Sequence, residues 1–260
     1  MKIGVLLDHY YLPIRQAAAE AARAGFAGVQ IYTTAGELAP ENLSRSGQRE
    51  LLSLLAGHGL TLSALCADLG GPRFADSATA DARIARTCRI IEQAAELRVP
   101  VVTAHVGTIS TEPTDPGRAL ITQAVDAIGA VADRASVRFA IETGQEDPRV
   151  LGAFVASFNN RALGVNYDPA NLLMNGFDPI GGLGSLAEFV VYVHAKDAVG
   201  GKGRPAREMD LGEGDVDYPA FVAALASAGY AGWHTVEHKH SRNPVAELAA
   251  ACQYLHRLSG

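Results

Sequence analysis

The stretch RFAIETGQEDPRVLGAFVASFNNRALGVNYD, residues 138–168, decides the fold of this chain. It begins with the apolar run RFAIE, continues through a helical pattern over 147–157, and reaches a second apolar run, LGVNY, just before Asp168. Both runs place apolar residues on consecutive positions, which is typical of strands that are buried on both faces. The stretch therefore predicts a strand–helix–strand unit with parallel strands.

The same alternation extends in both directions from this unit. Six further runs of the same kind begin at Ile3, Gly28, Thr61, Val101, Val190 and His234. Helical periodicity also covers 15–24, 46–56, 78–98, 116–135, 217–228 and 243–258. Eight strand–helix units in 260 residues match the usual size of a (β/α)₈ barrel. We therefore predict an α/β fold, a (β/α)₈ TIM barrel, as a single domain over residues 1–260. An open doubly wound sheet is the alternative, although the glycine-rich nucleotide-binding motifs of such sheets do not occur.

Composition and charge limit the classes of function. The chain is 48% hydrophobic, and 28 acidic residues against 22 Lys plus Arg give a net charge of -6, which argues against binding to nucleic acid or anionic lipid. No apolar segment resembles a membrane helix, and no signal-peptide pattern follows Met1, so we expect a cytoplasmic protein. Cys66, Cys88 and Cys252 form no CxxC pair, which predicts free thiols instead of a disulfide framework.

Ionisable residues gather at the carboxyl ends of the predicted strands. Strands five to eight end in Glu142, Asp168, His194 and Glu237. In a barrel these ends meet on one face, where neighbouring strands lie about 4.8 Å apart, so the four side chains could converge. Three carboxylates at that distance repel one another unless a cation lies between them. Oxygen-rich ligation with one imidazole suits Mn²⁺, Mg²⁺ or Co²⁺ better than a structural zinc site, with zinc left open as a further choice.

Each of these residues also has an ordinary structural explanation. A single acid at a strand end often caps the next helix, and Asp168 followed by Pro169 has the sequence of a helix N-cap. A single buried histidine is more often a hydrogen-bonded residue than a ligand. The occurrence of all four at equivalent positions nevertheless favours a metal site.

At these positions the sequence resembles the sugar phosphate isomerase/epimerase superfamily, the xylose isomerase-like TIM barrels that include tagatose and psicose 3-epimerases, hydroxypyruvate isomerase and inosose dehydratase. The matching motifs are AIETG around Glu142, GVNYDPANL around Asp168, VHAKD around His194, LGEGDVDYPAF at 211–221, and TVEH around Glu237. The resemblance implies that Glu142, Asp168, His194 and Glu237 bind a divalent metal ion. It also implies that Glu142 and Glu237 act as acid and base on opposite faces of the substrate.

The resemblance implies a metal-dependent isomerase or epimerase that removes a proton next to the carbonyl of a small sugar or sugar-like substrate, through an enediolate. Asn171 stands where the 3-epimerases have the histidine of a D-x-x-H motif, and an amide cannot carry a proton, which weakens the epimerase interpretation. A metal-dependent dehydratase similar to inosose dehydratase is the alternative. An endonuclease IV-like DNA-repair enzyme is a third interpretation, disfavoured by the negative charge and dispersed histidines.

Three further residues are candidates for substrate binding. His105 ends strand four and could hydrogen-bond a substrate oxygen, and Lys196 lies two residues beyond His194 and could stabilise an enediolate. Arg207 could bind the distal end of the substrate, as an arginine after strand seven does in related barrels. The glycines of 199–206 predict a mobile active-site loop. We expect a small carbohydrate or cyclitol as substrate, no nucleic-acid or membrane partner, and a homo-oligomer as one possible assembly.

Overall fold

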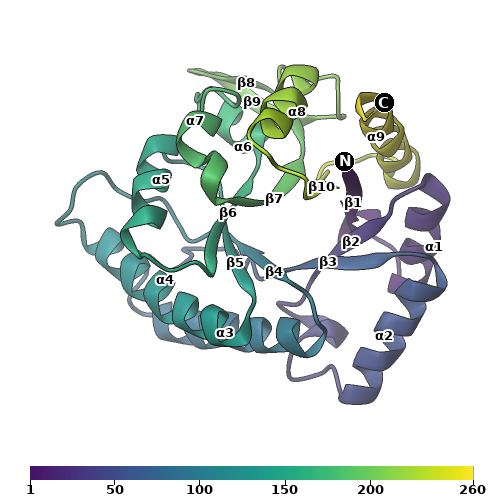
Figure 1. Cartoon of the computed structure of the whole chain (residues 1–260), viewed down its shortest axis with the longest axis horizontal. Helices are drawn as coiled ribbons and strands as arrows, with labels where there is room; N and C mark the ends of the chain where they lie inside the picture. The colour runs from purple at the N-terminus through teal and green to yellow at the C-terminus, as the bar shows by residue number, and fades with distance from the viewer. Residues whose placement is uncertain (260) are drawn as a thin grey trace.

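The sheet is a closed barrel of eight parallel strands in the order β1-β10-β7-β6-β5-β4-β3-β2 in the computed structural model, which describes residues 1–259 (Figure 1). The barrel strands are β1 (Lys2–Leu6), β2 (Gly28–Tyr32), β3 (Thr61–Cys66), β4 (Val101–Ala104), β5 (Arg138–Glu142), β6 (Leu163–Tyr167), β7 (Val190–Ala195) and β10 (Trp233–Val236). The predicted α/β class and (β/α)₈ TIM barrel are thereby confirmed.

Helices surround this barrel in Figure 1. They are α1 (Ile14–Ala24), α2 (Arg45–Gly57), α3 (Ala80–Glu96), α4 (Pro116–Ala135), α5 (Pro148–Ser157), α6 (Pro169–Met174), α7 (Leu183–Leu186), α8 (Tyr218–Ser227) and α9 (Pro244–Leu258). Three 3₁₀ turns, η1 (Leu7–Tyr10), η2 (Gly36–Leu38) and η3 (Ala187–Phe189), complete the elements of the described residues. The short α6 is the element that matters most for the site, because it begins directly after β6.

Polar side chains inside the barrel are paired with one another. The Tyr192 hydroxyl lies 2.7 Å from Ser63 Oγ and accepts a hydrogen bond from Thr235 Oγ1 at 2.6 Å. Gln30 Nε2 donates to Thr103 Oγ1 at 2.7 Å. Buried polar groups need such partners, and each bond removes a rotational choice from the side chain that makes it. The barrel interior therefore holds its polar side chains in defined orientations next to the strand ends.

The glycine-rich segment after β7, predicted as an active-site loop, is a β-hairpin, and its mobility stays a prediction. Strands β8 (Asp197–Gly201) and β9 (Arg204–Met209) pair antiparallel outside the barrel. A Cβ atom on Gly200, where φ is +96°, would lie 2.1 Å from the Pro205 carbonyl oxygen. One on Gly201, where φ is +77°, would lie 2.0 Å from the Leu173 carbonyl oxygen of α6. These glycines thus allow close packing between the hairpin strands and against α6.

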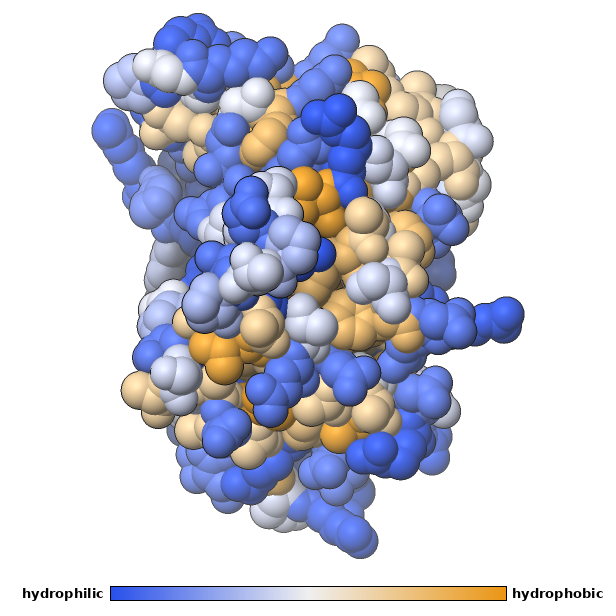
Figure 2. All heavy atoms as spheres, turned by 90° about the vertical axis from the view of Figure 1, so that its left-hand side faces the viewer, coloured by the Kyte–Doolittle hydropathy of each residue, from blue (hydrophilic) through white to orange (hydrophobic). Residues whose placement is uncertain are grey.

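The surface on the side of α4 and α5 mixes hydrophilic residues with a central apolar area (Figure 2). The large hydrophobic side chains exposed among residues 1–259 are Met1, Tyr11, Leu12 and Val245. In the described part of the chain, no helix combines the length and the apolar character needed to span a membrane. The expected homo-oligomer stays a prediction.

Candidate metal centre

The four strand-end residues converge at the carboxyl end of the barrel. Glu142 is the last residue of β5, Asp168 follows β6, His194 lies in β7 and Glu237 follows β10. One ligand atom from each lies within 4.8 Å of the others, and all four residues are buried. His194 Nδ1 lies 3.3 Å from Glu142 Oε1 and 3.2 Å from Glu237 Oε2. The arrangement offers three carboxylates and one imidazole to a single point.

The two carboxylate oxygens of Asp168 have different environments. Oδ1 accepts a hydrogen bond from the backbone N–H of Asn171 at 2.9 Å and thereby caps α6. Oδ2 is buried and has no hydrogen-bond partner among residues 1–259, and the Lys196 ammonium is 3.6 Å away. A buried carboxylate oxygen without a hydrogen bond is costly unless a cation binds it. Asp168 can therefore cap α6 with Oδ1 and bind a metal ion with Oδ2.

His194 is oriented from inside the barrel by Gln30. Nε2 of the ring lies 2.9 Å from Gln30 Oε1, and since that amide is fixed by its bond to Thr103, the network assigns the ring proton to Nε2. The amide nitrogen of Asn166 lies within hydrogen-bond distance of both ring nitrogens, at 3.2 Å from Nδ1 and 3.3 Å from Nε2. Nδ1 then faces the carboxylates, and its lone pair would be the one available to a metal ion, as in metal sites where the histidine donates its other N–H.

Sequence reasoning missed Gln30, although one signal was present. It is the polar residue in the middle of the apolar run GVQIY, and it is fully buried. A polar side chain in such a run needs a partner inside the barrel. Nothing local to β2 identifies His194 as that partner, because the two residues meet only across the closed barrel.

The electrostatics of the cluster favour positive charge at its centre. Burial opposes protonation of His194, yet Glu142 and Glu237 raise its pKa to about 10. Burial also opposes ionisation of Glu142, but His105 and His194 lower the pKa of this carboxyl to about 2. For Asp168, burial raises the pKa to about 6. Three buried carboxylates therefore face the His194 imidazole, the Lys196 ammonium and the Lys239 ammonium, whose Nζ lies 2.8 Å from Glu237 Oε1, so the cluster attracts positive charge such as that of a divalent cation.

Two of the three predicted substrate-binding residues lie against the cluster. His105 follows β4, and its Nε2 is 3.4 Å from Glu142 Oε1. Lys196 is buried, with Nζ 3.4 Å from Glu237 Oε2 and 3.2 Å from Asn171 Oδ1. Arg207 lies apart from them: it is exposed on β9, and its guanidinium contacts the sulfur of Met209 at 2.6 Å. It shares with Lys196 only the wall of a wider cavity.

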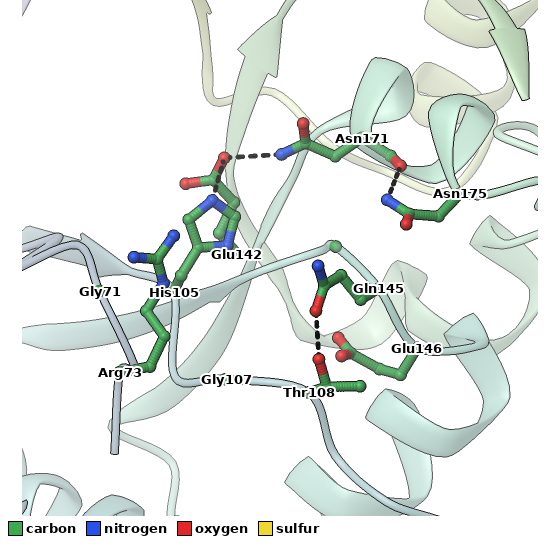
Figure 3. Close-up of a pocket in the computed structure, with 11 residues that line it drawn as sticks. Gly71, Arg73, His105, Gly107, Thr108, Glu142, Gln145, Glu146, Asn171 and Asn175 are labelled. Atoms are coloured by element: carbon green, nitrogen blue, oxygen red, sulfur yellow. Dashed lines mark hydrogen bonds and ion pairs between the residues drawn. The ribbon is translucent and has the colours of Figure 1, made fainter. Parts of the chain in front are cut away.

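A cavity of about 290 Å³ opens beside Glu142 (Figure 3). Glu142, His105 and Asn171 form its wall next to the cluster, and Arg73 and Gln145 also line it. Asn171 Nδ2 donates to Glu142 Oε1 at 3.0 Å while its Oδ1 accepts from Lys196, so the amide bridges the two charged groups. A second cavity of about 700 Å³ borders Lys196 and Arg207. Arg73 and Gln145 were not predicted, because loop residues carry no periodic signal.

Comparison with known proteins gives one partial relative among curated sequences. The rhizopine catabolism protein MocC of Rhizobium meliloti is 31% identical over 125 residues. The match covers 43% of this chain and 37% of that protein, so it spans little more than a third of the relative.

Solved structures are similar over nearly the whole chain. A D-tagatose 3-epimerase-like protein has a TM-score of 0.81 at 19% identity, covering 100% of this chain and 98% of that one. The probable 3-DHS dehydratase AsbF of Bacillus anthracis has a TM-score of 0.80 at 15% identity, with coverages of 98% and 99%. A xylose isomerase-like TIM barrel protein from Mycobacterium smegmatis in complex with magnesium has a TM-score of 0.75 at 18% identity, covering 94% of this chain and 87% of that one. At these identities the likeness is one of fold.

A family model assigns the chain. The model described as xylose isomerase-like TIM barrel matches residues 18–258, which include all four residues of the cluster. The structure adds the closed eight-stranded barrel that this description requires. The chain therefore belongs to the xylose isomerase-like TIM barrel family.

Proposed function

We propose that this protein is a divalent-metal-dependent isomerase or epimerase acting on a small sugar or sugar-like hydroxy-carbonyl substrate. The observation that carries the proposal is the buried cluster of Glu142, Asp168, His194 and Glu237, in which Asp168 Oδ2 is without a hydrogen-bond partner in the described chain. Membership of a family whose structural neighbours include a sugar 3-epimerase-like protein supports it.

The donor set fits Mn²⁺, Mg²⁺ or Co²⁺, which accept carboxylate oxygens together with an imidazole. Glu142, Asp168, His194 and Glu237 would hold the ion, with His194 using Nδ1 because Nε2 is bonded to Gln30. When bound, the ion would act as a Lewis acid toward the substrate carbonyl and the adjacent hydroxyl. The similarity to a barrel protein in complex with magnesium is consistent with this choice.

Glu142 and Glu237 are the proposed acid/base pair. Glu142 borders the cavity of about 290 Å³, whereas Glu237 contacts Lys196, which borders the cavity of about 700 Å³. A substrate between the two carboxylates would meet them from different sides. One glutamate removes the proton next to the carbonyl, and the other returns a proton to the opposite face for epimerisation or to the neighbouring carbon for isomerisation.

His105, Lys196 and Arg207 are the proposed substrate-binding residues. The His105 imidazole, beside Glu142 and partly exposed, can hydrogen-bond a substrate hydroxyl. The Lys196 ammonium can stabilise negative charge on an enediolate oxygen, because it is buried and fixed by Glu237 and Asn171. Arg207, at the outer wall of the larger cavity, would contact the distal end of the substrate.

Incubation of the protein with Mn²⁺ and a panel of ketoses and inositol derivatives in deuterated water tests the proposal. Proton abstraction predicts solvent deuterium in recovered substrate or in an isomer, detected by NMR and mass spectrometry. Loss of water from the substrate would instead support the dehydratase alternative, whose fold-level neighbour is AsbF. Absence of exchange and of product across the panel, in protein that binds Mn²⁺ at the four residues, would contradict the proposed reaction.

A further inference from the structure

A second group of metal-ligating side chains lies in the wall of the larger cavity, outside the four-residue cluster. It consists of Asp210 after β9, His238 after β10 and Glu247 in α9, and one ligand atom from each lies within 4.8 Å of the others. His238 and Glu247 belong to adjacent segments of the chain, and the fold brings Asp210 to them. Nothing in the proposed isomerase chemistry uses them.

His238 is the unusual member of this group. The residue is only 7% exposed, and neither ring nitrogen makes a hydrogen bond within residues 1–259. Nε2 lies 3.6 Å from Asp210 Oδ1, 3.7 Å from Glu208 Oε1 and 3.9 Å from Glu247 Oε2. All three separations exceed normal hydrogen-bond length, so even an imidazolium would donate to none of these oxygens. The side chain is more than nine-tenths buried, and its unpaired Nε2 faces three carboxylates in the cavity wall, an arrangement that points to a ligand between them.

The spacing suits a cation better than direct contact. An ion bound at about 2.1 Å by nitrogen and oxygen in tetrahedral geometry holds its ligand atoms about 3.4 Å apart. The observed separations of 3.6 and 3.9 Å for Asp210 and Glu247 need to close by a few tenths of an ångström for that geometry. For Nε2 to hydrogen-bond either carboxylate directly, the same distance would have to shorten by about twice as much or more.

The remaining contacts leave negative charge facing His238. Glu208 is the third carboxylate near the ring, but the Lys196 ammonium lies 3.8 Å from its Oε2 and offsets its charge. Asp210 has no side-chain hydrogen bond among the described residues, and its side chain is 49% exposed, so it is free to move toward an ion. Glu247 is held in place because it accepts hydrogen bonds from the Ser241 hydroxyl and from the backbone N–H groups of Arg242 and Asn243, the latter two at 3.2 and 3.0 Å.

We propose that Asp210, His238 and Glu247 form a second divalent-cation site, separate from the four-residue cluster. An imidazole with two carboxylates selects a transition ion such as Zn²⁺, Mn²⁺ or Co²⁺ over Mg²⁺ or Ca²⁺. Three protein ligands leave coordination positions open toward the cavity, which is the pattern of a site accessible to a small molecule. This proposal does not depend on the proposed isomerase reaction.

Metal stoichiometry tests the site without an activity assay. The chain is stripped with chelator and titrated with Mn²⁺ by calorimetry, and bound metal is counted by elemental analysis after dialysis. We expect two ions per wild-type chain, one in Asp210→Asn, one in Asp168→Asn and none in the double variant. Glu213→Gln, which removes an exposed acid from the same cavity wall, should still bind two.

A spectroscopic measurement identifies the nitrogen ligand. In Asp168→Asn loaded with Mn²⁺, electron spin echo spectra should show coupling to a ¹⁴N nucleus, and this coupling should disappear when His238→Gln is added. The second site would be overturned if Asp210→Asn and His238→Gln each still bound two ions. It would also be overturned if the wild-type chain bound one ion and Asp168→Asn bound none. Loss of an ion in Asp210→Asn but none in Asp168→Asn would instead contradict the metal site of the proposed function.

Discussion

Gln30 and His194, which are 164 positions apart in the sequence, meet inside the barrel, where the imidazole Nε2 lies 2.9 Å from the amide oxygen Oε1. The contact leaves Nδ1 directed at the carboxylates of Glu142 and Glu237. A residue buried inside the barrel thus determines which nitrogen faces the candidate metal centre.

Gln30→Leu should therefore weaken divalent metal binding. Without the acceptor the ring loses its fixed tautomer and orientation, and losses of such supporting contacts typically cost about 10- to 100-fold in metal affinity. Calorimetric titration of Mn²⁺ measures the change. The matched control is Gln93→Leu, which removes another buried glutamine, bonded to the Leu38 carbonyl away from the cluster. Equal affinities in both variants would show that Gln30 has no orienting role.

Asp168→Asn and Asp168→Ala should separate the two roles of this carboxylate. Asparagine keeps an oxygen for the α6 cap but removes the charge, so metal binding should fall with little loss of stability. Alanine should lose metal binding and, in addition, about 1 kcal/mol of cap stability. Asp147→Ala, which removes the partly exposed N-cap of α5, is the converse control: it should lose stability and keep the metal. Wild-type metal content in Asp168→Asn would exclude Asp168 as a ligand.

Glu142→Gln and Glu237→Gln should each lower turnover by at least about 10²-fold, because the amide keeps an oxygen near the ion but cannot transfer a proton. In an enzyme that uses two bases, one of the variants should still exchange the substrate proton with deuterated water without forming product. Turnover and exchange are measured on metal-loaded protein. Near wild-type turnover in both variants would mean that the glutamates are ligands only.

Arg207→Ala should raise KM roughly tenfold and leave kcat nearly unchanged, because one charge-assisted hydrogen bond to the distal end of a substrate is worth about 1.5 kcal/mol. Arg204→Ala is the matched control on the same strand, since Arg204 is exposed and pairs with Asp215 at 3.4 Å. Steady-state kinetics on the substrate found in the exchange assay give both constants. An unchanged KM in Arg207→Ala would remove this residue from the substrate site.

Glu146 should make the protein less stable as the pH rises. Burial raises the pKa of this carboxyl from 4.5 to about 7, against the backbone N–H of Ile109, which lowers it. The folded state therefore binds more protons than the unfolded state between these two values, and its stability falls as the pH increases through that window. Glu146→Gln should remove up to about 3 kcal/mol of this pH dependence.

Denaturant unfolding at pH 5 and pH 8 checks that expectation. The variant should equal the wild type at the lower pH and exceed it at the higher one. Parallel stability curves for the two proteins would show that Glu146 does not titrate with a raised pKa.

The alternation of strands and helices, and the strand ends at which ionisable residues gather, could be predicted from the amino-acid sequence alone. Apolar runs such as RFAIE and LGVNY, and the Asp-Pro step that starts α6, act through neighbouring residues along the chain, so their signal can be read locally. Because the carboxyl ends of parallel barrel strands meet on one face, the same local pattern also indicated that Glu142, Asp168, His194 and Glu237 would converge.

Only the tertiary structure decided the contacts that depend on closing the barrel. It paired Gln30 with His194, placed the Asn171 amide between Glu142 and Lys196, and left Arg207 away from the cluster. It also folded the glycine-rich segment after β7 into a hairpin, in which Gly201 closely approaches the Leu173 carbonyl oxygen of α6. These contacts join residues tens to hundreds of positions apart, and no periodicity in a single segment encodes the geometry between segments.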